Sequence, residues 1–234
     1  MERKEFIKKL GFTMMVAPLL GACSKDEDPT AIDTNTNNNG ACTVTPSETA
    51  GPFPTKNPST LAMADIRSDR SGVTMSVQIT IRNKNADCAF LEGAVVDIWH
   101  CDKDGNYSEY GGSGMQSSNY TSVHFLRGRQ TTNASGLVGF TTIFPGWYSG
   151  RAPHIHVHIY DSTGKSLLVT QIAFPKAVTD VVYTSSSLYS SRGKQDTTNE
   201  SDNVFSDGYA NELGVVSGSV NDGYSLVHTI VVSK

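Results

Sequence analysis

Residues 73–82 read VTMSVQITIR, and this stretch decides the fold class. Apolar residues alternate strictly with polar ones from Val73 to Ile81. Because successive side chains of a β-strand point to opposite faces, this period of two predicts a strand with one buried face. Residues 83–87, NKNAD, follow it as a turn signal. The stretch is therefore typical of a half-buried strand in a sheet.

Further strands are predicted along the chain, with turn signals between them. Residues 94–99 are largely apolar, and the other candidates are residues 137–143, 154–160, 167–174 and 224–232. No segment shows a sustained helical period, and the polar stretch 176–223 is predicted to wrap the domain as loops. Short strands at this spacing predict an all-β fold, a single β-sandwich of mostly antiparallel strands with long loops.

The N-terminal residues predict export. Residues 1–22 combine a basic start with an apolar run that is too short to span a bilayer. The run ends in Leu20-Gly21-Ala22-Cys23, which resembles the lipobox of bacterial lipoproteins, where cleavage leaves a lipidated cysteine. The alternative is an ordinary signal peptide with an incidental cysteine. We expect an exported, membrane-anchored lipoprotein, periplasmic or on the cell surface, attached through Cys23.

Composition divides the rest of the chain into a tether and one domain. Residues 23–40 follow the cleavage site and have no apolar face to bury, so they predict a lipidated cysteine on a flexible tether. Residues 41–234 are enough for one domain with a substantial core. The net charge is −4 and this domain has no basic cluster, which disfavours nucleic-acid binding. The oligomeric state is left open.

The mature domain contains an odd number of cysteines, namely Cys42, Cys88 and Cys101. At most one internal disulfide can form. Cys88 and Cys101 flank the predicted strand 94–99, and an extended chain rises about 3.3 Å per residue, which separates them by more than the roughly 7 Å between Cα atoms that a disulfide tolerates. We therefore expect Cys42 to be one partner of any disulfide.

The stretch His154-Ile155-His156-Val157-His158 is the first sign of chemistry. Alternate residues of a strand face one side, so His154 and His156 are predicted to present two imidazoles to the same point. Neutral imidazole binds iron, zinc, copper or nickel. A polar strand face explains the pattern equally well, and a zinc site with His158 as the third ligand is a further alternative.

Neighbouring motifs narrow this choice. Residues 144–153 read FPGWYSGRAP and residues 99–107 read WHCDKDGNY. Residues 125–130 read FLRGRQ, and the stretch 42–54 contains Gly51-Pro52-Phe53. In this order the motifs resemble the intradiol ring-cleavage dioxygenases, the family of catechol and protocatechuate dioxygenases. The resemblance extends over most of the mature chain.

The resemblance implies a ferric iron, Fe(III), held by four side chains, which are Tyr107, Tyr148, His154 and His156. It also implies that Arg151 and Gln171 lie beside the substrate, where Arg151 stabilises negative charge and Gln171 orients a displaced ligand or solvent. Tyr148 takes a catalytic part as well, because in the family this tyrosine leaves the metal when the substrate binds. The expected substrates are a catechol-type compound and O2, with cleavage between the two hydroxyls to a muconate-type diacid.

The residue types suit this chemistry. Phenolates are hard, anionic donors that favour ferric over ferrous iron, and a trivalent cation lowers the phenol pKa from its ordinary value near 10. A second function stays open. The same sandwich could be a non-catalytic, surface-anchored module that binds metal or aromatic compounds.

Overall fold

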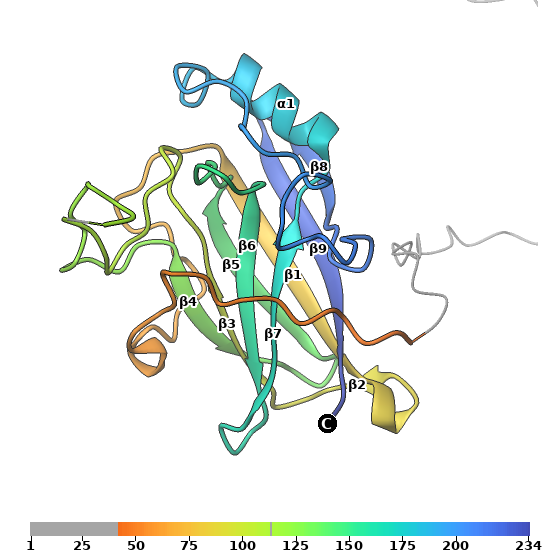
Figure 1. The fold of residues 1–234 in the computed structure, drawn as a ribbon. Helices are drawn as coiled ribbons and strands as arrows, with labels where there is room; N and C mark the ends of the chain where they lie inside the picture. The colour runs from red at the N-terminus through yellow and green to blue at the C-terminus, as the bar shows by residue number, and fades with distance from the viewer. Residues whose placement is uncertain (1–41, 113) are drawn as a thin grey trace, which may run out of the picture. The chain divides into compact units, whose positions relative to one another are not determined.

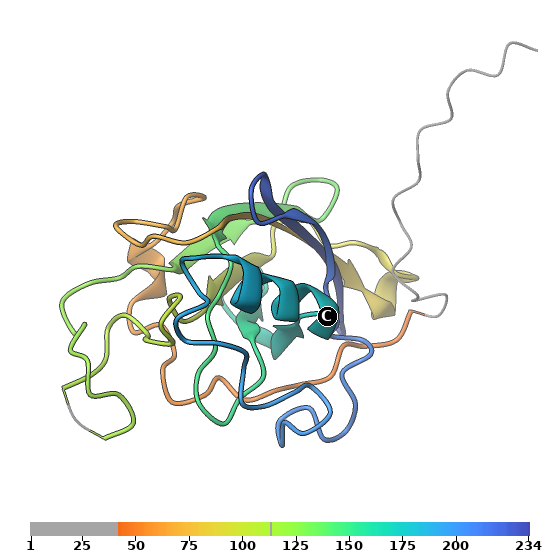
Figure 2. The same cartoon turned by 90° about the horizontal axis from the view of Figure 1, so that it is seen from above.

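The computed structural model describes residues 42–112 and 114–234; the predicted signal peptide, Cys23 and the tether as far as residue 40 lie outside them. The described residues form two β-sheets packed face to face, with one α-helix beside them (Figure 1, Figure 2). The elements in chain order are η1 (Pro58–Thr60), β1 (Thr74–Asn83), η2 (Lys84–Ala86), β2 (Ala89–Phe90), β3 (Val95–Trp99), β4 (Arg127–Thr131), β5 (Leu137–Ile143), β6 (His154–Tyr160), β7 (Ser166–Ala173), α1 (Lys176–Ser185), β8 (Val215–Ser219) and β9 (Gly223–Val232).

One sheet has the strand order β4-β3-β6-β7 and is antiparallel throughout. The other has the order β2-β1-β9-β8, with β5 also paired to β1. Its β1 and β9 run parallel, while its other pairs are antiparallel. The predicted all-β sandwich of mostly antiparallel strands is therefore confirmed.

The core lies between the two sheets. In β1 the four apolar residues of the alternating pattern are fully buried, and these are Met75, Val77, Ile79 and Ile81. The facing sheet contributes Ile155, Val157 and Ile159 of β6, which are equally buried. Since these β6 residues alternate with the histidines, the histidines occupy the opposite face of their sheet.

The predicted strands match β1, β3, β5, β6, β7 and β9 to within two residues at each end. Residues 176–223 were predicted to be loop-rich and to wrap the sandwich, without a sustained helical period; besides loops they contain α1 and β8, which the sequence did not indicate. The sequence of α1, KAVTDVVYTS, is rich in β-branched residues with weak helix propensity. Tertiary packing stabilises it instead: Thr179, Val182 and Tyr183 are buried, and the Tyr183 hydroxyl donates to the Pro145 carbonyl at 2.9 Å.

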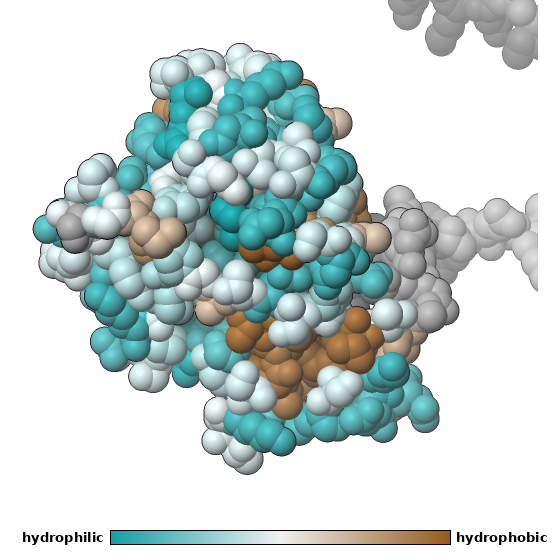
Figure 3. All heavy atoms as spheres, in the orientation of Figure 1, coloured by the Kyte–Doolittle hydropathy of each residue, from teal (hydrophilic) through white to brown (hydrophobic). Residues whose placement is uncertain are grey.

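The segment 42–56 crosses the face of the β4-β3-β6-β7 sheet that points away from the core (Figure 1). Backbone hydrogen bonds attach it to two strands: Thr45 donates to the Val231 carbonyl at 3.0 Å, and Glu48 donates to the Val169 carbonyl at 2.8 Å. On the same side of the molecule, hydrophilic residues cover most of the surface and apolar residues gather over its lower part (Figure 3). The segment thus covers residues on this sheet face that would otherwise meet water.

A disulfide joins Cys42 to Cys88, with 5.9 Å between the Cα atoms. The prediction that Cys42 is one partner is confirmed, and Cys101 is a buried free thiol. The bond connects the start of the segment 42–56, called the covering segment below, to the turn after β1. Within residues 42–112 and 114–234, no helix has the length and apolar content needed to cross a membrane.

Replacing Cys42 and Cys88 together by alanine should destabilise the domain. The bond closes a loop with a sequence separation of 46, and releasing such a loop costs on the order of 3–4 kcal/mol through the entropy of the unfolded chain. For a domain of this size we expect the melting temperature to fall by about 10 °C in a circular dichroism melt. A reductant should lower the melting temperature of the wild type toward that of the double variant and leave the variant unchanged. Equal melting temperatures without reductant would contradict the prediction.

Candidate metal centre and active site

His154 and His156 lie side by side on the covered face of β6. Their Nε2 atoms are 3.0 Å apart and their ring planes are nearly perpendicular, at 85°. Both side chains are buried. Burial lowers the pKa of His154 to about 3 and the pKa of His156 well below its ordinary value. Both imidazoles are therefore neutral at physiological pH, the form that binds metal ions.

Neighbouring groups hold the two rings in place. The Nδ1 atom of His154 lies 2.6 Å from the Ala152 carbonyl, which assigns the ring proton to Nδ1 and leaves the lone pair on Nε2. The ring of His156 stacks on Trp99 of β3, with centroids 4.8 Å apart and planes within 5°. Gly51 of the covering segment closes over His156, where a Cβ atom would lie 3.1 Å from the ring. Both imidazoles are thus oriented before any ligand binds.

Tyr107 contributes an oxygen at the same point. Its hydroxyl lies 3.4 Å from Nε2 of His154, and its ring stacks on Phe53 at a centroid distance of 4.8 Å. Burial raises the pKa of Tyr107 well above its ordinary value. Ionisation of this phenol at neutral pH therefore requires a cation beside it.

Tyr148 stands at the edge of the cluster, with its ring tilted against two others. Its ring centroid is 6.1 Å from that of Tyr107 and 5.4 Å from that of Phe53. Its hydroxyl donates to the Met115 carbonyl at 2.9 Å. Tyr148 is only partly buried, unlike Tyr107. Tyr107 therefore contacts the histidine pair from the buried side, whereas Tyr148 packs on Tyr107 and Phe53 at the more exposed edge of the cluster.

Arg151 and Gln171 form a chain of polar contacts beside the histidines. The Arg151 guanidinium donates to the Gln171 side-chain carbonyl at 2.6 Å, and the Gln171 amide donates to the Thr49 carbonyl at 2.8 Å. Gln171 of β7 is also the register partner of His156 of β6. Strand pairing thus places Gln171 beside the site although it is distant in sequence.

Asp202 is a site residue that sequence reasoning missed. Both of its oxygens accept hydrogen bonds from Nε of Arg151 at 2.9 Å, and one also accepts the backbone N–H of Ala152 at 2.7 Å. The carboxylate is fully buried, and the arginine side chain is 13% exposed. Asp202 therefore neutralises part of the positive charge of Arg151, which was expected from the sequence to act on the substrate alone. It lies in a polar loop 51 residues from Arg151, where no local pattern marks it.

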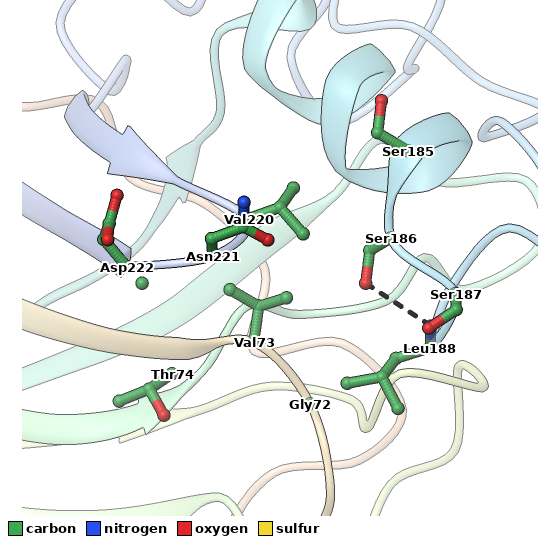
Figure 4. A pocket seen from close by; sticks show the side chains of 11 residues that line it. Gly72, Val73, Thr74, Ser185, Ser186, Ser187, Leu188, Val220, Asn221 and Asp222 are labelled. Atoms are coloured by element: carbon green, nitrogen blue, oxygen red, sulfur yellow. Dashed lines mark hydrogen bonds between the residues drawn. The ribbon is translucent and has the colours of Figure 1, made fainter.

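A cleft of about 500 Å³ lies elsewhere, between the start of β1, the end of α1 and the turn before β9 (Figure 4). Residues 72–74, 185–188 and 220–223 line it. None of these is a histidine or tyrosine of the cluster, and the wall in Figure 4 combines serine and other polar side chains with Val73, Leu188 and Val220. The cleft is separate from the chemistry-bearing cluster.

Comparison with known proteins agrees with the geometry of the cluster. Residues 50–205 match the family model described as Dioxygenase, a span that contains both histidines and both tyrosines. The chain belongs to the intradiol ring-cleavage dioxygenase family.

Individual relatives support this membership of the intradiol dioxygenases. The chlorocatechol 1,2-dioxygenase of Rhodococcus opacus is 32% identical over 143 residues, which are 53% of this chain and 51% of that protein. The match thus spans about half the length of this curated relative. An intradiol ring-cleavage dioxygenase from Tetranychus urticae has a solved structure with a TM-score of 0.73 and 29% identity, covering 82% of this chain and 95% of that chain.

A more distant structure shows the fold alone. The 3-chlorocatechol 1,2-dioxygenase of Rhodococcus opacus superposes with a TM-score of 0.53 at 18% identity, covering 81% of this chain and 72% of the other. The shared fold thus persists at an identity where side chains differ at most positions.

The residues of the cluster fit the metal that the family implies. The hydrogen bond between the two Nε2 atoms uses the single ring proton of His156, because His154 carries its own on Nδ1. If that proton moves to Nδ1 of His156, both Nε2 lone pairs are free to bind a cation. Nδ1 of His156 is buried without a hydrogen-bond partner among the described residues. Two imidazole nitrogens with the Tyr107 hydroxyl beside them and Tyr148 at the edge of the cluster suit a transition metal that accepts both nitrogen and hard oxygen donors.

His158 does not join the pair formed by His154 and His156. Its Nε2 atom lies 2.8 Å from the Ser166 hydroxyl, and its Nδ1 atom lies 2.8 Å from the Tyr160 hydroxyl, so both ring nitrogens are engaged elsewhere. Within the part of the chain that the structure describes, no three histidine, cysteine or acidic side chains gather where they could hold a metal ion. The geometry therefore speaks against the zinc site with His158.

Replacing Asp202 by asparagine should destabilise this domain strongly. The change leaves the nearly buried charge of Arg151 without its counterion, which typically costs about 3–5 kcal/mol. Urea denaturation followed by circular dichroism measures the loss. Asp65→Asn is the control, because Asp65 also pairs with an arginine, Arg67, but at an exposed site where water screens the interaction. Equal effects of the two substitutions would show that Asp202 does not act as the counterion.

Proposed function

We propose that the chain is an iron(III)-dependent intradiol dioxygenase that opens a catechol-type ring with O2 between its two hydroxylated carbons, giving a muconate-type diacid. The observation that carries this proposal is the convergence of two neutral imidazoles, 3.0 Å apart, with the hydroxyl of Tyr107. Family membership adds the reaction type. His154, His156, Tyr107 and Tyr148 are the residues that hold the metal in this proposal.

Held by His154, His156, Tyr107 and Tyr148, ferric iron would supply Lewis acidity toward a catechol. The phenolate form of each tyrosine is the form that such a cation stabilises, against the effect of burial on the tyrosine pKa. Two anionic oxygens also balance most of a trivalent charge. The tyrosines therefore favour the ferric state.

The protein supplies an aromatic lining for the substrate ring. Phe53 stacks on Tyr107 and meets Tyr110 and Tyr148 edge-on, at centroid distances of 5.3 and 5.4 Å. Such side chains exclude water and hold a flat ring by stacking and edge contacts. This lining favours an aromatic substrate over an aliphatic diol.

Tyr148 is the residue best placed to take a proton from an incoming catechol. It lies at the more exposed edge of the cluster, and the Met115 carbonyl, 2.9 Å from its hydroxyl, can accept that proton in a hydrogen bond afterwards. Arg151 provides positive charge beside the histidines, held there by Asp202 and Gln171. That charge stabilises negative charge that develops on the ring.

Iron loading and product analysis test the proposal together. Purified protein loaded with ferric iron should hold one ion per chain and be coloured, because phenolate-to-iron charge transfer absorbs visible light. Given catechol and O2, it should form a colourless diacid, identified by mass and ultraviolet spectrum. Tyr107→Phe should shift or weaken the band, and His156→Ala should reduce iron retention. Tyr209→Phe is the control, since Tyr209 bonds to Glu200 on the surface.

Other outcomes separate the alternatives. A yellow semialdehyde would mean cleavage beside the hydroxyls and would exclude the proposed regiochemistry. An iron-replete, coloured protein without turnover on a broad catechol panel would favour the non-catalytic binding module. A colourless protein that binds zinc in preference to iron would contradict the metal assignment.

We also propose that the protein is exported and anchored in a membrane through a lipid on Cys23. The sequence Leu20-Gly21-Ala22-Cys23 motivates this, and the disulfide between Cys42 and Cys88 supports export, since such bonds persist in oxidising compartments.

Expression in a bacterial host with detergent phase partitioning tests the anchor. The wild type should enter the detergent-rich phase, and Cys23→Ala should stay in the aqueous phase, because acyl chains provide the membrane affinity. Cys101→Ala is the matched control, as it removes a thiol that is buried in the domain. A Cys23→Ala protein that partitions like the wild type would refute the anchor.

A further inference from the structure

The tyrosines of the cluster depend on the long connection between β3 and β4. This connection, residues 100–126, carries Tyr107, and its described residues include neither a named helix nor a strand. Strand hydrogen bonds therefore do not hold the backbone at Tyr107. A metal ligand needs a fixed position, so other groups must satisfy and orient this backbone.

The side chain of Gln116 does this. Its carbonyl oxygen accepts the backbone N–H of Tyr107 at 2.6 Å, and its amide donates to the Tyr107 carbonyl at 2.8 Å. The same amide also lies 3.1 Å from the carbonyls of Tyr110 and Ser118. Gln116 is only 6% exposed. One buried side chain thus pairs with both polar groups of the Tyr107 backbone, as a neighbouring strand would.

Few other side chains can make this pattern. Glutamine carries an acceptor and a two-hydrogen donor on one planar group, whereas glutamate offers acceptors alone when ionised. Leucine has a similar volume and offers neither. Because the site is buried, carbonyls that lose the amide cannot all turn to water instead.

The adjoining backbone contacts the second tyrosine. The carbonyl of Met115, directly before Gln116, accepts the hydroxyl of Tyr148 at 2.9 Å. The bonds of Gln116 thus locate Tyr107 directly and locate, through one peptide unit, the acceptor for Tyr148. The positions of both tyrosines thus depend on Met115 and Gln116.

We propose that Gln116 is a positioning residue that sets the place of both tyrosines at the metal centre. This inference rests on the proposed function and deepens it, since it assigns the geometry of the oxygen ligands to a residue outside the ligand set. When Tyr148 is not a ligand, its hydroxyl rests on the Met115 carbonyl that Gln116 holds in position.

The rest of the connection has independent attachments, so loss of the Gln116 amide should leave the domain folded. Arg127 of β4 donates to the Ser108 carbonyl at 2.7 Å and to the Phe53 carbonyl at 3.0 Å. The Ser108 hydroxyl donates to the Phe125 carbonyl at 2.7 Å. These bonds anchor the residue after Tyr107 without fixing Tyr107 itself.

The first test uses hydrogen exchange in metal-free protein, measured by mass spectrometry on peptides that cover residues 105–118. Gln116→Leu removes every bond of the amide and should speed exchange of the Tyr107 N–H at least about tenfold, since each lost bond weakens local closure. Gln116→Glu keeps an acceptor for that N–H but loses the donor, so it should retain more protection. Gln195→Leu is the matched control, because Gln195 donates to Thr179 of α1, a helix outside the cluster.

The second test uses iron-loaded protein of the same variants. Gln116→Leu should release iron to a chelator at least about tenfold faster than wild type and shift the visible band, while its melting temperature in the metal-free form stays close to that of Gln195→Leu. A purely structural role would lower the melting temperature without moving the band.

Unchanged exchange at Tyr107 together with an unchanged band and iron release in Gln116→Leu would overturn the inference. An equal loss of iron from Gln195→Leu would overturn it as well. If Gln116→Leu does not fold, the comparison rests on Gln116→Glu, for which a wild-type band and release rate would have the same meaning. Failure of the proposed function is distinguishable, because it would appear in the wild type itself, as a protein that binds no iron or that binds iron without cleaving catechol between its hydroxyls.

Discussion

The two-residue period of β6 is the constraint on which the rest of the structure depends. Ile155, Val157 and Ile159 face the core between the sheets, and this fixes His154 and His156 on the opposite face of the same strand. A shift of one residue would exchange the two sets and destroy the core and the site together. Packing energy therefore holds the two imidazoles in register, and the site needs no local stabilisation of its own to keep them on one face.

Because the site lies on the outer face of a sheet, it needs a second element that shields it from water. The segment 42–56 supplies it: Gly51 closes over His156, and Phe53 stacks on Tyr107. The cover removes water, and the resulting desolvation lowers the pKa of both histidines and raises the pKa of Tyr107, so that these groups are uncharged until a cation binds. The same desolvation demands partners for every other polar group at the site, which explains the ion pair of Arg151 with the buried Asp202.

Prediction from sequence was most accurate where a pattern is local. The alternation in β1 and the histidine spacing in β6 each depend on strand geometry alone, and both appear in the structure as expected. The helix α1 was missed because its propensity is weak and its stability comes from packing of Val182 and Tyr183. The strand β4 was missed for a related reason: its polar sequence RGRQT forms a strand because β3 offers it a partner edge.

The sequence by itself determined the sandwich, the histidine pair on one strand face, the family and the partnership of Cys42 in a disulfide. Only the tertiary structure decided that Cys88 is the other partner, that His158 is engaged elsewhere, and that Asp202 and Gln116 belong to the site. The physical reason is the sequence separation over which each kind of signal acts. Period and motif act over a few residues, whereas a buried charge or a free backbone group takes whichever partner the fold brings near, and that partner carries no mark in its own neighbourhood of the sequence.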